Sequence, residues 1–165
     1  MHKCISALTE ANPRAVVLAF DCSNAYNSLP RQHILNGLRA RAPALLKTAH
    51  SWLGGETTHL FWDNSNSAEP VRATSGVDQG CPLSPAFFAI TVAGALDAIN
   101  GRLRQLSPEC RVFSYLDDIM VYSPPEHAAA AAQLVPQELA RLGLTDNSAK
   151  TQACAADQQA PFHLA

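Results

Sequence analysis

The sequence predicts an α+β fold, in which helices pack on one face of an antiparallel sheet. Three observations support this prediction. Residues 14–21 contain a continuous apolar run, residues 15–20, and end on Asp21, as a buried central strand would. Residues 112–122 place strand-type residues on both sides of Asp117 and Asp118, as in a β-hairpin. Segments with the helical spacing of apolar residues lie between these strands along the chain.

The composition is that of a packed globular protein. Of its 165 residues, 47% are hydrophobic and 16% are charged, and this length favours one domain, residues 1–165. The formal net charge is −2, so composition alone does not support nucleic-acid binding. The five cysteines are scattered and lack a C-x-x-C pair, which predicts reduced thiols in an intracellular protein. The longest apolar run, residues 86–96, is shorter than the roughly 18 residues of a membrane span, so we expect no membrane partner.

The first half of the chain predicts two helices and a hairpin. Apolar residues with helical spacing predict helices over residues 30–41 and 43–54. Residues 56–62 have strand-type composition. The Asn- and Ser-rich residues 63–67 predict a turn, after which residues 71–74 would return as the second strand.

The second half predicts a long helix, the acid-tipped hairpin, another helix and a last strand. A glycine-punctuated loop precedes the first of these helices, over residues 83–105. An Ala-rich helix over residues 126–142 would end at Gly143. Residues 151–155 predict a short strand. This order of elements allows the strand that ends on Asp21 to lie beside the acid-tipped hairpin.

Asp21, Asp117 and Asp118 are candidate metal ligands. Two carboxylates about 4 Å apart repel each other by roughly 4 kcal/mol at an effective dielectric constant near 20. That is a large share of the roughly 5–15 kcal/mol that stabilises a domain, and a divalent cation is the usual compensation. Oxygen ligands of this kind suit Mg²⁺, and two such ions about 3.5–4 Å apart promote phosphoryl transfer.

Four segments resemble the palm domain of reverse transcriptases. They are residues 20–26 (FDCSNAY, motif A), residues 76–85 (GVDQGCPLSP, motif B), residues 115–118 (YLDD, motif C) and residues 142–151 (LGLTDNSAKT, motif D). Motif B is most similar to enzymes of non-LTR retrotransposons and group II introns. The resemblance covers residues 14–155 and implies a polymerase palm with a partial fingers segment. It also implies that further fingers and thumb segments would belong to a longer polyprotein.

The resemblance implies an RNA-directed DNA polymerase, which transfers a nucleotide from a dNTP to a DNA primer on an RNA template. Asp21 and Asp117 would hold two Mg²⁺ ions, with Mn²⁺ as the alternative ion, and Asp118 would be the supporting acid. The Cys22 carbonyl would be a further metal ligand. Lys150 would approach the pyrophosphate leaving group.

Other implied site residues have more than one interpretation. Tyr26 would be the steric gate under the nucleotide sugar or a buried aromatic residue at the exit of a strand. Gln79 and Gly80 would lie along the incoming nucleotide and template, because glycine permits close backbone approach and glutamine both donates and accepts hydrogen bonds. Tyr115 would pack under the acids or contact the primer.

Two alternatives to this function remain open on the sequence alone. The first is a catalytically inactive remnant of a retroelement, acting as a binding or interaction module, which the near-neutral charge favours because phosphate contacts need Lys and Arg. The second is a palm polymerase that copies RNA into RNA. Tyr26 argues against the second alternative if it occupies the position of the sugar gate.

Overall fold

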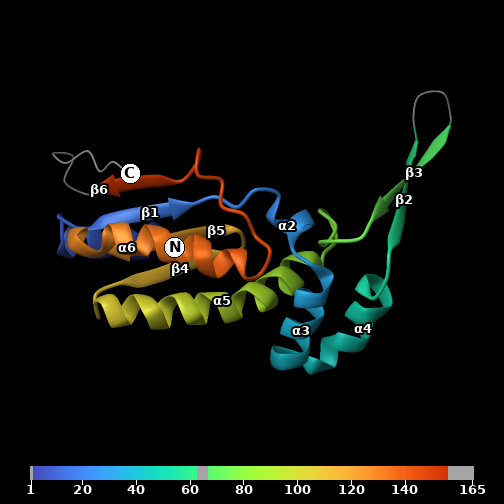
Figure 1. Cartoon of the computed structure of the whole chain (residues 1–165), viewed down its shortest axis with the longest axis horizontal. Helices are drawn as coiled ribbons and strands as arrows, with labels where there is room; N and C mark the ends of the chain where they lie inside the picture. Colours follow the sequence, from blue (N-terminus) through green and yellow to red (C-terminus); the bar gives the residue numbers. More distant parts are fainter. Residues whose placement is uncertain (1, 63–66, 156–165) are drawn as a thin grey trace. The chain divides into compact units, whose positions relative to one another are not determined.

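A computed structural model describes residues 2–62 and 67–155 and divides into two compact units, residues 1–25 with 93–165 and residues 26–92. The first unit holds a four-stranded antiparallel sheet with the order β4-β5-β1-β6 (Figure 1). Its strands are β1 (Val16–Phe20), β4 (Arg111–Tyr115), β5 (Asp118–Ser123) and β6 (Gln152–Ala155). β1 pairs with both β5 and β6, so the apolar run is a central strand, as predicted.

Helix α6 (Pro125–Ala140) covers one face of this sheet. It contacts β1 and β5 (Figure 1), and the alternating residues Val16, Leu18 and Phe20 of β1 are buried. An ion pair between Arg102 and Glu138 joins α6 to α5 (Ser84–Leu106). Helices packed on an antiparallel sheet confirm the α+β prediction.

The opposite face of the sheet carries a helix that the sequence did not predict. This helix is α1 (His2–Ala11). Successive side chains of a strand point to opposite faces of the sheet, so Tyr122 lies on the face opposite to Val121. The Tyr122 hydroxyl donates to the Leu8 carbonyl of α1 at 3.3 Å. The same face is more open near the turn between β4 and β5, where Tyr115 is 68% exposed. Most described side chains of α1 are exposed, and none of those of residues 3–11 is fully buried.

The unit of residues 26–92 holds two helices and a hairpin, with the short α2 (Ala25–Ser28) at its start. Helix α3 (Arg31–Arg41) buries Ile34, Leu35 and Leu38 and packs against α4 (Pro43–Leu53). Both helices lie within one residue of the predicted ranges.

The hairpin consists of β2 (Thr57–Trp62) and β3 (Ala68–Ala73), which form a two-stranded sheet. Its side chains are largely exposed, and Leu60, Phe61 and Trp62 are each about 60% accessible. β3 begins three residues earlier than predicted, because an edge strand tolerates Pro70. Most of the predicted turn, residues 63–66, lies outside the described residues.

Helix α5 is long and apolar enough to cross a membrane on length and composition alone. Its Phe87, Phe88, Val92, Ile99 and Leu103 are at most 1% exposed, so these side chains belong to the protein interior. They form the buried face of α5, while most of its other side chains are half-buried or exposed.

Candidate active site

The register of β1 and β5 brings two of the predicted acids to one end of the sheet. Phe20 is paired with Ile119, so Asp21 follows this pair on one strand and Asp118 precedes it on the other. Neighbouring strands lie about 4.7–4.9 Å apart, so the two backbones are adjacent here. Asp117 belongs to the two-residue turn between the paired Tyr115 and Asp118. The predicted proximity of the Asp21 strand to the acid-tipped hairpin is confirmed.

The turn itself is strained and more open than its apolar flanks suggest. Leu116 has φ of 57°, a left-handed conformation that leucine rarely adopts. Asp117 is half-buried and Asp118 is exposed. Tyr115 is exposed too, so it does not pack under the acids. Exposure to water lowers the repulsion between these carboxylates below the value expected for a buried pair.

The pKa of the buried Cys22 thiol is affected by the negative charge at this end of the sheet. Burial raises the pKa of Cys22 to about 11, and the carboxylates of Asp146, Asp117 and Asp21 add to the increase in that order. All three carboxylates therefore act on the same thiol. Asp146 was not among the predicted site residues, although it lies in the segment that contains Lys150.

Backbone contacts attach the Asp146 segment to the end of β1. Cys22 and Asp146 form an isolated antiparallel bridge. The Ser23 N–H donates to the Thr145 carbonyl at 2.9 Å, and the Asn147 N–H donates to the Asp21 carbonyl at 2.7 Å. These bonds join two loops rather than two regular strands, so no periodic pattern in the sequence indicates them.

Lys150 lies at the predicted acids. Its Nζ is 3.6 Å from Asp21 Oδ2, and the side chains are 68% and 40% exposed. The Lys150 N–H donates to the Asn147 carbonyl at 2.8 Å, so the same loop that binds the Asp21 carbonyl also holds the lysine.

The donor chemistry at this end of the sheet fits a hard divalent cation, because aspartate oxygens dominate it. Within residues 2–62 and 67–155, however, no three His, Cys, Asp or Glu side chains are grouped as ligands of one ion. Lys150 instead contacts one of the carboxylates. The backbone therefore brings the acids together, and side-chain rotation would be needed to surround an ion.

The remaining predicted residues belong to the unit of residues 26–92. The ring of Tyr26 stacks on Phe88 with a centroid distance of 4.7 Å and an interplanar angle of 7°. Its carbonyl accepts from the Val77 N–H at 2.9 Å, which ties the end of motif A to motif B. Gln79 and Gly80 are exposed, and Gly80 has φ of 92°, which requires glycine.

The four motifs lie on strands, turns and a loop–helix junction in the order that the resemblance implied. Residues 1–163 match the family model of "Reverse transcriptase (RNA-dependent DNA polymerase)". The chain belongs to the reverse transcriptase family. It is 33% identical over 134 residues to the retrotransposable element SLACS 132 kDa protein of Trypanosoma brucei gambiense, covering 80% of this chain.

Solved telomerase structures share the fold. The apo telomerase of Candida tropicalis has a TM-score of 0.73 at 15% identity over 93% of this chain. A Candida albicans telomerase bound to a telomeric RNA fragment has a TM-score of 0.74 at 14% identity over 97% of it. The reverse transcriptase chain spans 11% of the SLACS protein and 31% of each of these telomerase chains.

Proposed function

We propose that this chain carries the metal-binding end of an RNA-directed DNA polymerase, which extends a DNA primer on an RNA template with dNTPs. Membership of the reverse transcriptase family supports this activity. The observation that carries the proposal is the β1–β5 register, which makes Asp21 a neighbour of the Asp117–Asp118 turn. The similarity to a retrotransposable-element protein favours a retroelement as its origin.

Asp21 and Asp117 would hold two divalent ions, Mg²⁺ or Mn²⁺, with Asp118 as the supporting acid and the Cys22 carbonyl as a further ligand. Bound divalent ions lower the pKa of the attacking hydroxyl and stabilise charge on the leaving pyrophosphate. The backbone of the Asp21 segment is held by the Asn147 N–H, and rotation of the Asp21 and Asp117 side chains would bring their oxygens to an ion.

Lys150 would act on the pyrophosphate as a cation or a proton donor. Its backbone N–H is bonded within the Asp146–Thr151 loop, and its ammonium group lies beside Asp21, near where the leaving group would form. Its distance of 3.6 Å from Asp21 Oδ2 supports a role within this site rather than in bulk solvent.

Tyr26 would lie beneath the sugar and reject a 2′-hydroxyl, while Gln79, Gly80 and Tyr115 would contact the nucleotide, template or primer. The stack on Phe88 holds the Tyr26 ring in one plane, as a steric gate requires. Replacement by alanine should raise incorporation of ribonucleotides relative to deoxynucleotides. An unchanged ratio would favour a packing role for Tyr26 alone.

The test is primer extension by the 165-residue chain with an RNA template, a DNA primer, four dNTPs and Mg²⁺. Asp117→Ala and Asp21→Ala should each reduce extension by more than about 100-fold, because loss of a group that merely supports a metal ligand costs about 10–100-fold. Glu109→Gln, which removes an exposed acid of the same unit, is the matched control. Extension that survives Asp117→Ala would contradict the proposal.

A metal-binding measurement separates the active enzyme from an inactive remnant. Titration with Mn²⁺ should give saturable binding that Asp117→Asn weakens and Glu109→Gln does not. Mn²⁺ binding without primer extension would favour the inactive remnant. Absence of both Mn²⁺ binding and extension would contradict the proposed metal site.

A further inference from the structure

The unit of residues 26–92 contains a cavity that none of the three proposed metal ligands lines. Its volume is about 480 Å³, and its walls come from α4, β2, the loop after Gly76 and the first turn of α5. Small-molecule sites in proteins have volumes of roughly 300–1,000 Å³. The cavity is therefore large enough for a small organic ligand.

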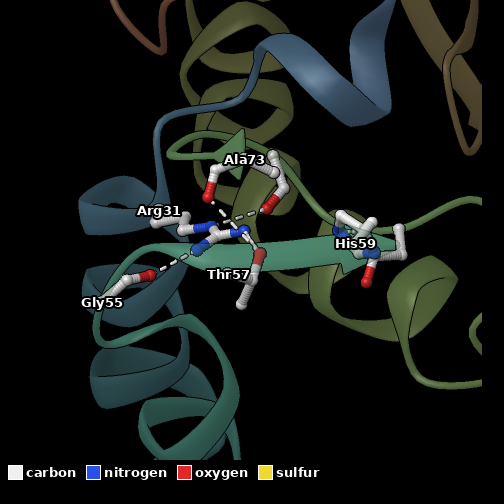
Figure 2. A network of polar contacts seen from close by, with 7 residues as sticks. Arg31, Gly55, Thr57, His59 and Ala73 are labelled. Atoms are coloured by element: carbon white, nitrogen blue, oxygen red, sulfur yellow. Dashed lines mark hydrogen bonds and ion pairs between the residues drawn. The ribbon is translucent and has the colours of Figure 1, made fainter. Parts of the chain in front are cut away.

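Arg31 supplies a buried positive charge to this cavity. Its side chain comes from the first turn of α3, and the residue is only 7% exposed. The guanidinium donates from Nε to the Gly76 carbonyl at 3.2 Å, from Nη2 to Thr57 Oγ1 at 2.8 Å, and from Nη1 to the Gly55 carbonyl (Figure 2). These bonds use three of its five N–H groups and connect it only to neutral oxygens.

The charge of Arg31 has no counterion among the described residues, since no carboxylate of residues 2–62 or 67–155 lies within ion-pair distance of it. Buried charges in proteins are normally paired, because an isolated charge loses its hydration without compensation. The hydrogen bonds explain how Arg31 joins α3 to the hairpin, but they leave its positive charge open to an anion.

Asp78 is the acidic residue of the cavity wall, and it is already paired. Its Oδ1 lies 3.3 Å from Nε2 of His59, and the two side chains are about half exposed, so the pair lies toward water. The positive charge of Arg31 is therefore buried, whereas the His59–Asp78 pair lies at the exposed part of the lining.

The rest of the lining combines apolar side chains with the hydroxyl groups of Ser51, Thr57, Thr58 and Ser84. Leu53, Val77 and Phe87 are buried, and the indole of Trp52 is 47% exposed. A half-exposed tryptophan in a cavity wall offers a face on which a flat ring can stack. The lining thus combines one buried cation, several hydroxyl groups, and an aromatic and aliphatic surface.

We propose that this cavity binds a small aromatic carboxylate, with its anionic group at Arg31 and its ring against Trp52 and Phe87. The carboxylate would accept the N–H groups of Arg31 that face no protein oxygen, and charge-assisted bonds of this kind are the strongest that a guanidinium makes. The carboxylate site is separate from the proposed metal site, because none of the three proposed metal ligands lines the cavity, whereas Val77, Asp78, Cys81 and Ser84 of motif B do.

The experiment compares two isosteric probes on the unchanged protein, 2-naphthoate and the neutral 2-naphthamide, by titration calorimetry. We expect 2-naphthoate to bind about tenfold more tightly, because a hydrogen bond to a charged group is roughly twice as strong as a neutral one. In NMR spectra the indole signal of Trp52 should shift on binding, while that of Trp62, outside the cavity, should not. Equal affinity of the two probes, or no shift of Trp52, would overturn the proposal.

Variants locate the anion. Arg31→Met should abolish the preference for 2-naphthoate, whereas Lys47→Met, which removes an exposed positive charge from α4, should leave it unchanged. Because Arg31→Met also removes three structural bonds, Asp78→Asn provides a second variant that leaves the Arg31 contacts intact. It should tighten 2-naphthoate more than 2-naphthamide, since it removes the negative charge of the cavity wall. A preference that neither Arg31→Met nor Asp78→Asn alters would place the anion elsewhere and contradict the assignment.

Discussion

Lys150 and Asp21 form an ion pair at the end of β1, with 3.6 Å between Nζ and Oδ2. The pair joins a residue of motif D to the first proposed metal ligand. In the structure, the ammonium group lies beside the Asp21 carboxylate. If Asp21 holds a divalent ion as proposed, the lysine and the ion would compete for this carboxylate.

Replacement of Lys150 by methionine should increase metal affinity in the absence of substrates. The pair is exposed, and such pairs contribute about 0.2–1 kcal/mol, so the Kd for Mn²⁺ should fall by a factor of about 1.4 to 5. Electron paramagnetic resonance of free Mn²⁺ measures this change. Lys47→Met controls for the loss of one positive charge, and unchanged or weaker binding in Lys150→Met would show that the lysine does not compete.

The raised pKa of Cys22 predicts a loss of stability at alkaline pH. The unfolded thiol releases its proton from about pH 9, whereas the folded thiol keeps it until about pH 11. Between these values the folded state binds more protons, so the free energy of unfolding decreases as the pH rises and levels off above the window. The contribution is at most about 2–3 kcal/mol.

Urea unfolding at about pH 8 and about pH 10.5 tests this linkage. Cys22→Ser should lose less stability than the wild type between the two pH values, while Cys4→Ser, at an exposed cysteine, should behave as the wild type does. An identical pH dependence in all three proteins would contradict the shift.

The elements with strong local patterns were predictable. β1 is a continuous apolar run, and the register that places Asp21 beside Asp118 follows from pairing it with a hairpin of matching length. Other features depend on contacts that leave no periodic signal. α1 has few buried side chains, and the Cys22–Asp146 bridge joins two loops, so neither α1 nor the role of Asp146 was predicted.

Exposure was also harder to predict than strand identity. The apolar flanks of Asp117 and Asp118 are typical of a buried hairpin, but at the end of the sheet Asp118 is exposed and Asp117 is only half-buried. β3 begins before its predicted start because it includes Glu69 and Pro70. Such residues are disfavoured in central strands, but an exposed edge strand tolerates them.

Gly76 should be essential for the unit of residues 26–92. It has φ of 71°, and an added Cβ would lie 2.4 Å from the Asn27 Cα and 2.5 Å from the Tyr26 carbonyl oxygen. Both contacts are with backbone, which cannot move without disrupting the link between motifs A and B. Gly76→Ala should therefore destabilise the protein by more than about 1 kcal/mol.

Substitutions at two other glycines distinguish the backbone strain from the steric clash that Gly76→Ala introduces. At Gly80, φ is 92° but the added Cβ meets nothing within 4 Å, so Gly80→Ala measures backbone strain without a clash. At Gly55 neither cause applies, and the substitution should be nearly neutral. Thermal unfolding should rank the losses as Gly76, then Gly80, then Gly55, and a smaller loss at Gly76 than at Gly80 would refute the steric explanation.

The burial of the Glu138 carboxylate should depend on its ion pairs with Arg102 and Arg141. The carboxylate is 3% exposed and pairs with Arg102 of α5 and, at 2.8 Å, with Arg141. The arginine side chains are 45% and 69% exposed, so water can hydrate their charges when the ion pair is lost. The buried Glu138 carboxylate cannot be hydrated in this way. The double variant Arg102→Met/Arg141→Met should lose about 3–5 kcal/mol, more than the sum of the single losses, since only the double variant leaves a buried charge unpaired.

Addition of Glu138→Leu to the double variant should restore most of the lost stability, because it removes the unpaired charge while keeping an apolar side chain between α5 and α6. Urea unfolding of the single, double and triple variants measures each step. Arg104→Met, which removes an exposed arginine from α5, controls for the general effect of charge. Additive single losses, or a triple variant no more stable than the double, would show that the ion pairs do not compensate the burial of Glu138.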